Sequence, residues 1–493
     1  MPPDTEPPTH LLHRLTSYSH DREWTEPVPD PRIVQGLVPN DEMHRPQWYK
    51  AYDADLPRIL LTPDLPASTV PALAVLAGTA EPGEHAPHPS FPPDLAGLAR
   101  LLHLSAGITR TTVNRAGVTM LFRAAGSAGA RFPLELYVAV PGDLDTDVPP
   151  GVHWYDPDAH ALVTVGPPPA GTAPTVVVTG VPWRTGWRYA ERGFRHIYWD
   201  AGTMLAQLVA LADSAGLPAR LHTAFPDAEV AALVGADPVT EFPVAVVALG
   251  PGDPALRPTG DAVPGRHDAD GVVFPLVTQA QRAGCRSALG PELDRGPVVA
   301  LETTPEPVTP IDAVVAGKGS IRRLRADRSV PLALLRDAMA VSTRGIDVPH
   351  WIGANAVENL APGVYRWPDL EPARRSRSEA ALREELHGAA LEQGLAHDAS
   401  FVVMSGIELA GVDDHRYREV QLLAGLVEGR LHLAAGALGV AASGMTFRDA
   451  DLPGLLGPDV AGLLWTCVGV PEYRTRPSGR PGQPAEVHIV WPR

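Results

Sequence analysis

The sequence predicts an α+β protein made of two tandem copies of one domain. The chain has 493 residues, more than a single hydrophobic core usually organises, so more than one domain is expected. From about residue 95 onward, segments with strand-like and helix-like apolar patterns follow one another. The order of these segments is repeated in the second half, and repetition of a whole series indicates an internal duplication.

The elements of the first copy can be assigned one by one. Apolar residues recur at helical spacing in 95–104, which predicts a helix. Residues 196–217 are apolar on nearly every face, as in a buried helix, and Gly216 provides the stop signal at its end. Strands are expected at 134–140, at 151–158 (running into a turn), at 175–180 and at 243–250.

The second copy repeats this series. A helix at 332–339 corresponds to the first helix, and 415–440 corresponds to the buried helix, since both carry an aromatic-bearing start, an Ala-Gly step and a glycine near the end. The matching strands are expected at 362–367, 401–404 and 463–469.

Composition shifts suggest the domain boundaries. Residues 1–90 are Pro-rich and weakly periodic, which predicts an N-terminal extension, and 251–310 is rich in Pro, Gly and Asp, which predicts a linker that could wrap a neighbouring unit. The two copies are then expected at 91–250 and 311–493.

Charge and cysteine content exclude several function classes. The formal net charge of −16 argues against nucleic acid or anionic lipid as a partner, and no apolar run is long enough for a membrane span. The two cysteines, Cys285 and Cys467, cannot build a disulfide scaffold or a cysteine-based metal site. No metal-ligand spacing is present either, and a cytoplasmic location is expected.

A small-residue run after residue 122 is the first candidate for a ligand site. Its glycines and serine allow the backbone to approach a ligand closely and to direct successive N–H groups at it. Taken alone, this run is better explained as a turn ahead of a strand. The candidate binding residues are Arg123, Gly126, Ser127, Ala128 and Gly129.

The run 122–137 resembles a motif of nitroreductase-like flavoproteins. Residues 183–196, and the helix that follows from Asp200, resemble more narrowly the SagB-type dehydrogenases, which oxidise azoline rings in ribosomally made peptides. The resemblance implies two mainly antiparallel sheets flanked by helices, packed as a pseudo-dimer around one long helix from each copy. It also implies FMN as the cofactor.

In the second copy, residues 317–325 resemble the entry segment that holds the FMN phosphate in nitroreductases. Charged donors of this density suit a dianion, although a solvated basic run is the alternative. The closing segment 469–476 and residues 442–446 also resemble FMN-contacting segments of the family. The positions implied are Lys318, Ser320, Arg322, Ser443, Gly444, Arg474 and Arg476.

Each copy lacks a different part of this constellation. The first copy has His88-Pro-Ser in place of the cationic entry, and the second has Val341-Ser-Thr-Arg in place of the small-residue run. In the homodimeric family each flavin lies between subunits, so complementary losses would leave one complete site and dismantle the other. We therefore expect one FMN per chain.

The resemblance places the proton-handling pair at Arg188 and Tyr189. Tyr189 could act as an acid or base, while Arg188 stays protonated and is a poor base, and both could instead be packing residues. Lone histidines such as His103, His196 and His432 lie in apolar helical text and are expected to be packed.

The leading hypothesis is an FMN-dependent dehydrogenase that converts thiazoline or oxazoline rings of a modified peptide into thiazole or oxazole. One alternative is a small-molecule nitro or quinone oxidoreductase of the same fold. The other is a non-catalytic partner of a cyclodehydratase. The oligomeric state stays open, with a monomer built as an internal pseudo-dimer as one option.

Overall fold

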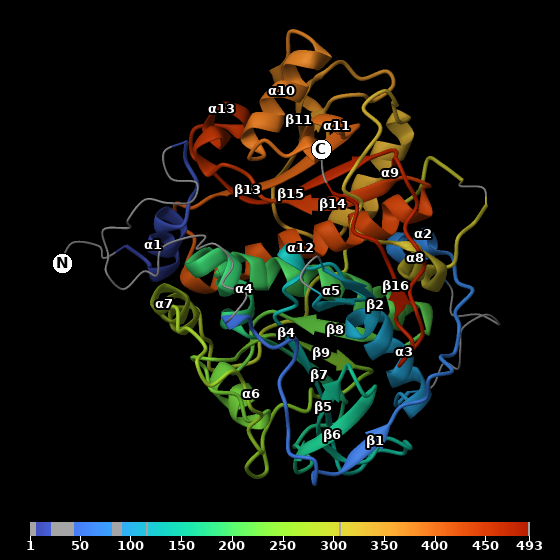
Figure 1. The fold of residues 1–493 in the computed structure, drawn as a ribbon, viewed down its shortest axis with the longest axis vertical. Helices are drawn as coiled ribbons and strands as arrows, with labels where there is room; N and C mark the ends of the chain where they lie inside the picture. Colours follow the sequence, from blue (N-terminus) through green and yellow to red (C-terminus); the bar gives the residue numbers. More distant parts are fainter. Residues whose placement is uncertain (1–5, 21–43, 81–90, 115–116, 305–306, 492–493) are drawn as a thin grey trace.

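Two sheets enclose a central pair of long helices in this protein. These helices, α5 (Gly193–Ser214) and α12 (Asp414–Ala437), lie between the sheet of the first half and the sheet of the second half (Figure 1). Nearly every residue of both helices is buried, and one hydrophobic core continues across them from half to half. The computed structural model describes residues 6–20, 44–80, 91–114, 117–304 and 307–491.

The first half contains a seven-stranded sheet in which all neighbours are antiparallel. Its strand order is β1 (Arg58–Leu60), β6 (Ala161–Gly166), β5 (Gly151–Asp156), β4 (Leu134–Val140), β7 (Thr175–Gly180), β9 (Phe242–Leu249) and β8 (Ala219–His222).

The second half contains a six-stranded antiparallel sheet. Its order is β12 (Glu371–Arg375), β11 (Gly363–Trp367), β10 (His350–Ala354), β13 (Phe401–Glu408), β15 (Val460–Gly469) and β14 (Ala441–Met445). Without β1, the first sheet has the same topology, so the two halves are copies of one α+β unit, as the sequence predicts.

The helices follow the same duplication only in part. Those of the first half and the linker are α1 (Pro8–Leu15), α2 (Ala72–Ala77), α3 (Leu95–Ala106), α4 (Pro182–Tyr189), α6 (Asp227–Leu233) and α7 (Pro275–Ala283). Those of the second half are α8 (Ile311–Gly317), α9 (Leu332–Thr343), α10 (Glu379–Ala389), α11 (Gly394–Asp398) and α13 (Leu452–Leu456). Within the described ranges, no helix is both long and apolar enough to cross a membrane.

Two glycines fix how the central helices match. A Cβ on Gly202 would collide with the backbone of Leu422 and Gly425, and a Cβ on Gly425 would collide with the backbone of Trp199. The reciprocal contacts relate Gly202 to Gly425 and Trp199 to Leu422 by a pseudo-twofold axis. Pro71 and Pro310, the residues that precede α2 and α8, form an antiparallel bridge with each other and so match in the same way.

The segment predicted as an N-terminal extension contributes elements to the first half. Strand β1 pairs with β6 at the sheet edge, and α2 is buried in the core. The Pro-rich composition hid these elements, because β1 has three residues and α2 has six. The domain boundaries drawn from the sequence remain a prediction.

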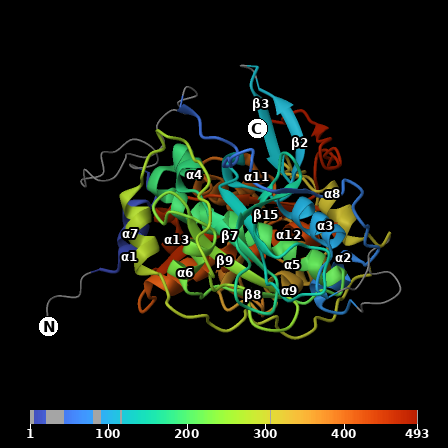
Figure 2. The same cartoon turned by 90° about the horizontal axis from the view of Figure 1, so that it is seen from below.

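A third, three-stranded sheet joins the halves. The hairpin of β2 (Ile108–Val113) and β3 (Thr119–Arg123) belongs to the first half, and β16 (Ala485–Glu486) pairs parallel to β2. Figure 2 shows this hairpin projecting from the body beside the C-terminal segment. The second half thus returns to cover the first.

Candidate functional site

A cavity of about 530 Å³ lies between the two halves and is called the open cavity below. The first half supplies Arg110 and residues from the 122–132 segment, which begins at the end of β3. The second half supplies residues 318–320, Arg322 and His432, together with residues from 473–476 and 486–490. The cavity therefore combines the small-residue run of one copy with the cationic segments of the other.

The loop after β3 is held by one buried carboxylate on α5. Asp200 accepts hydrogen bonds from the Ser127 hydroxyl at 2.5 Å and from the Ala128 N–H at 2.9 Å. Burial raises the pKa of Asp200 to about 7, although these two bonds favour the ionised form. Gly126, Ser127 and Gly129 line the open cavity, whereas the Ala128 N–H is used by Asp200. Sequence reasoning missed the role of Asp200, whose signal is an acidic residue in an otherwise apolar helix.

Lys318 brings a partly buried ammonium to the cavity directly after α8. Among the described residues its Nζ makes one hydrogen bond, a long one of 3.4 Å to the Ala124 carbonyl oxygen. Burial lowers the pKa of Lys318 to about 8; Glu428 opposes this shift and Arg110 adds to it. A charged group with so few partners is suited to an anionic ligand.

Further cations surround the same space. Arg110 donates to three carbonyl oxygens of the second half, those of Ala316, Lys318 and Arg476, at 2.8 to 3.0 Å. These bonds fix the hairpin against the segment that carries Lys318. The predicted residues Ser320, Arg322, Arg474 and Arg476 also line the cavity.

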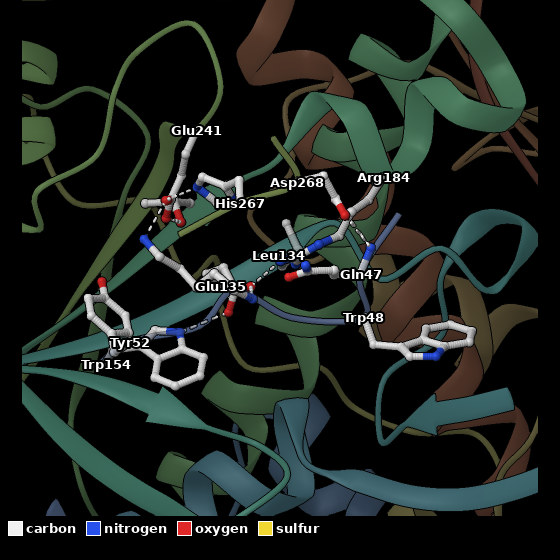
Figure 3. Close-up of polar contacts among 12 residues, drawn as sticks. Gln47, Trp48, Tyr52, Leu134, Glu135, Trp154, Arg184, Glu241, His267 and Asp268 are labelled. Carbon is white, nitrogen blue, oxygen red and sulfur yellow. Dashed lines mark hydrogen bonds and ion pairs between the residues drawn. The ribbon is translucent and has the colours of Figure 1, made fainter. Parts of the chain in front are cut away.

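Arg123 faces the cavity, but its guanidinium is already engaged. It donates to the carbonyl oxygens of Leu134 and Trp48, at 3.0 Å each, and burial lowers its pKa to about 10. Figure 3 shows the surroundings of Leu134 and Trp48. Arg123 thus attaches the segment before β1 to the cavity wall.

Glu135, in the same sequence run, lies in a buried ion cluster and does not line the cavity. It accepts from the Arg184 guanidinium at 2.5 Å and from the Trp154 indole at 2.9 Å (Figure 3). Nearby, Lys50 Nζ and His267 Nε2 contact Glu241 at 2.6 and 2.9 Å. This cluster ties both the N-terminal segment and the linker to the first sheet.

Tyr189 and Arg188 lie behind the cavity wall. Gly129 has a φ of +58°, and a Cβ at that position would be 2.8 Å from both the Tyr189 hydroxyl and Arg188 Cδ. The Tyr189 ring stacks on His196 with centroids 4.0 Å apart. Burial raises the pKa of Tyr189, and Arg188 partly offsets that effect. The pair borders the Gly129 backbone and is not part of the cavity lining.

Ser443 and Gly444 lie on β14 and do not line the cavity directly. A Cβ on Gly444 would be 2.8 Å from Glu428 Oε1, so this glycine makes room for the Glu428 side chain. Glu428 in turn contacts His432 at the cavity. The role predicted for Ser443 and Gly444 toward a cofactor stays a prediction.

Comparison with known proteins agrees with this architecture. Residues 113–251 match the family model described as the nitroreductase family. A putative nitroreductase of Methanocaldococcus jannaschii, MJ1384, is 28% identical over 176 residues, which are 33% of this chain and 82% of that protein.

Among solved structures, a putative nitroreductase from Anabaena variabilis superposes with a TM-score of 0.67 at 22% identity, covering 95% of this chain and all of that one. A putative nitroreductase from Ralstonia eutropha gives a TM-score of 0.29 at 21% identity, covering 44% of this chain and 96% of that one. The chain as a whole therefore has a nitroreductase-like fold, and its residues 113–251 match the nitroreductase family.

Proposed function

We propose that this protein is an FMN-dependent oxidoreductase that binds FMN in the open cavity. The observation that carries the proposal is the composition of the cavity, in which a small-residue loop from one half meets a cluster of cations from the other. The volume of about 530 Å³ lies in the range of cofactor sites.

The donor set fits the chemistry of FMN. A phosphate requires cations and a hydroxyl, which Lys318, Arg322 and Ser320 offer together with the C-terminal arginines. An aromatic ring system requires an apolar wall, which Phe122 and Phe132 offer. These two rings meet edge to face with centroids 6.5 Å apart. In a chain of net charge −16, a cation-rich cavity is a local feature that favours an anionic ligand.

The finer proposal is oxidation of an azoline ring in a modified peptide. When bound, FMN supplies the two-electron redox chemistry. Aromatising the ring also removes a proton, so the chain has to provide a proton acceptor near the cavity. Tyr189, whose hydroxyl borders Gly129, is the residue that the sequence resemblance suggests for handling this proton, as an acid or base or by orienting one.

One observation favours a second candidate, a flavin oxidoreductase for small nitro or quinone compounds. Arg188 stands where the SagB-type resemblance implies lysine, and neither Arg188 nor Tyr189 lines the cavity. Rapid bleaching of bound flavin by NAD(P)H, followed by turnover of such compounds, would support this candidate over the peptide oxidase.

The absorbance spectrum of the purified protein, with flavin counted per chain, tests the proposal directly. We expect a flavin spectrum and one FMN per chain. A colourless protein that does not bind added FMN would contradict the proposed function. Two flavins per chain would leave the function standing but contradict the single site.

A further inference from the structure

His432, which lines the open cavity, is paired with a buried carboxylate. On α12, His432 Nε2 lies 2.8 Å from Glu428 Oε1, and Glu428 Oε2 accepts from the Thr203 hydroxyl of α5 at 2.5 Å. The side chains of Glu428 and His432 are each 8% exposed, and His432 lines the open cavity. Both oxygens of Glu428 are thus occupied, one of them by a residue of the other half.

The charge state of Glu428 fixes the orientation of His432. Burial alone would raise the pKa of Glu428, but His432, Thr203 and Lys318 together hold it below its ordinary value. An ionised carboxylate only accepts, so the ring hydrogen is on Nε2. No hydrogen bond joins Nδ1 to any described residue, and the His432 residue lines the cavity.

The pseudo-twofold match shows that this pair is specific to the open cavity. In the register that relates Gly425 to Gly202, Glu428 corresponds to Leu205 and His432 corresponds to Val209. The same positions of the other central helix are therefore apolar. A polar pair retained on one helix alone is better explained by a ligand than by helix packing.

We infer that His432, held by Glu428, takes up a proton from solvent when an anionic ligand enters the open cavity. The inference rests on the proposed function, since FMN is the ligand considered. In the free protein, Arg110, Lys318 and Arg322 line the same cavity as the His432 ring. A phosphate dianion offsets those cations, while Glu428 stays in place to stabilise the imidazolium.

The charged and titratable groups that share the cavity with His432 come from several elements. Glu428 is its only acidic contact among the described residues. The others that line the cavity are Arg110, Arg123, Lys318, Arg322, Tyr473, Arg474, Arg476, Glu486 and His488. His432 and His488 are the two imidazoles in this set.

Isothermal titration calorimetry of the flavin-free full chain with FMN measures this uptake. Heats recorded at pH 7.0 in two buffers of different ionisation enthalpy give the number of protons bound. We expect a net uptake of protons in the wild type. His432→Gln should reduce the uptake to near zero while FMN still binds.

His488→Gln is the matched control, since His488 lines the same cavity, is exposed and has no carboxylate contact among the described residues. It should keep the wild-type uptake. Glu428→Gln should diminish the uptake with His432 still present, and it carries the test if the His432 variant does not fold.

The outcomes separate the two proposals. If the wild type does not bind FMN, both the proposed function and this inference fail. If FMN binds without proton uptake, or if uptake persists in folded His432→Gln or at the wild-type level in Glu428→Gln, only the role of His432 is wrong. Loss of uptake in His488→Gln alone would transfer the role to His488.

Discussion

At the open cavity, the residue that follows α8 is Lys318, whose ammonium reaches toward the Ala124 carbonyl oxygen of the other half. At the matching junction after α2 lies Gly78, which corresponds to Gly317, the residue before Lys318. There the cation comes from the other half, because a Cβ on Gly78 would lie 1.8 Å from Nη1 of Arg344, a side chain of the second half. The junction after α8 thus presents a cation to the open cavity. The space beside the junction after α2 is instead filled by a cation of the second half.

The linker completes the filling of this second position, which we call the filled counterpart. Leu293 N–H bonds to the Leu221 carbonyl on β8 at 2.7 Å, and Val299 N–H bonds to the Ala77 carbonyl at the end of α2 at 3.0 Å. Between them, Gly296 lies against the backbone of Gly345 in the second half. The linker therefore runs through the place where a second cavity would be.

The two central helices also differ between the open cavity and the filled counterpart. Asp200, which holds the loop of the open cavity, corresponds to Leu423 in the register of the two glycines. A homodimer must keep both of its equivalent sites, because one sequence builds both. A tandem duplication removes this constraint, so one interface can specialise for binding while the other becomes packing.

The largest expected effect is on cofactor binding. Lys318→Ala combined with Arg322→Ala removes two cations that line the open cavity, and charged hydrogen bonds of this kind contribute about 1.5–3 kcal/mol each. We expect FMN affinity, measured by fluorescence titration, to fall by at least about a hundredfold with the fold intact.

The matched control removes the same charge from the filled counterpart. Arg295→Ala combined with Arg344→Ala should leave FMN content unchanged, because Arg295 bonds to Asp213 and the Ala219 carbonyl and Arg344 faces Gly78. Equal loss of FMN in both double variants would show that the two positions do not differ as described.

The next effect concerns catalysis beside the open cavity. Tyr189→Phe keeps the ring stacked on His196 and removes only the hydroxyl beside Gly129. If the hydroxyl handles the substrate proton, turnover should fall by at least about a hundredfold with normal flavin content. Tyr365→Phe, which removes a hydroxyl bonded to the Ala361 carbonyl in the second half, should leave turnover unchanged. Unchanged turnover in the Tyr189 variant would mean that the proton acceptor is elsewhere.

The smallest effect is a pH-dependent change in stability. Since burial raises the folded-state pKa of Asp200 to about 7, from 3.8, ionisation of this carboxyl costs folding free energy as the pH rises from about 4 to 7. Asp200→Asn cannot ionise, so its free energy of unfolding relative to the wild type should increase over this range, by roughly 1–3 kcal/mol. Urea unfolding at pH 4.5 and 7.5 measures the difference.

A constant difference between the two pH values would show that Asp200 ionises normally in the folded protein. Leu423→Asn at the filled counterpart should instead be destabilising at both pH values, because it buries an amide without a designed partner.

Much of this architecture was readable from the sequence because its signals are local or repeated. The strand at 134–140 has the bounds that its largely apolar run predicts. The two central helices lie within a few residues of their predicted ranges. The structure also brings Gly126, Lys318 and Arg474 to one cavity, as the family resemblance implied. The cofactor roles of these residues remain predictions.

Other features were not readable because they depend on distant pairing. Strand β16 has two residues, and its pairing with β2 joins segments from opposite ends of the described chain. His432 was expected to be packed, since nothing in its helix shows that Glu428 and Thr203 orient it toward a cavity. His88, which stands in the first copy in place of the cationic entry, lies outside the described part of the chain.

The pairing of β16 with β2 also sets an order of events during synthesis. The first sheet is complete once Leu249 has been made, and domains generally fold from the N-terminus as the chain emerges. The walls of the open cavity, however, include residues 473–476 and 486–490. A ribosome must therefore translate almost the whole described chain before a cofactor can be captured, so flavin insertion would be among the last steps of biogenesis.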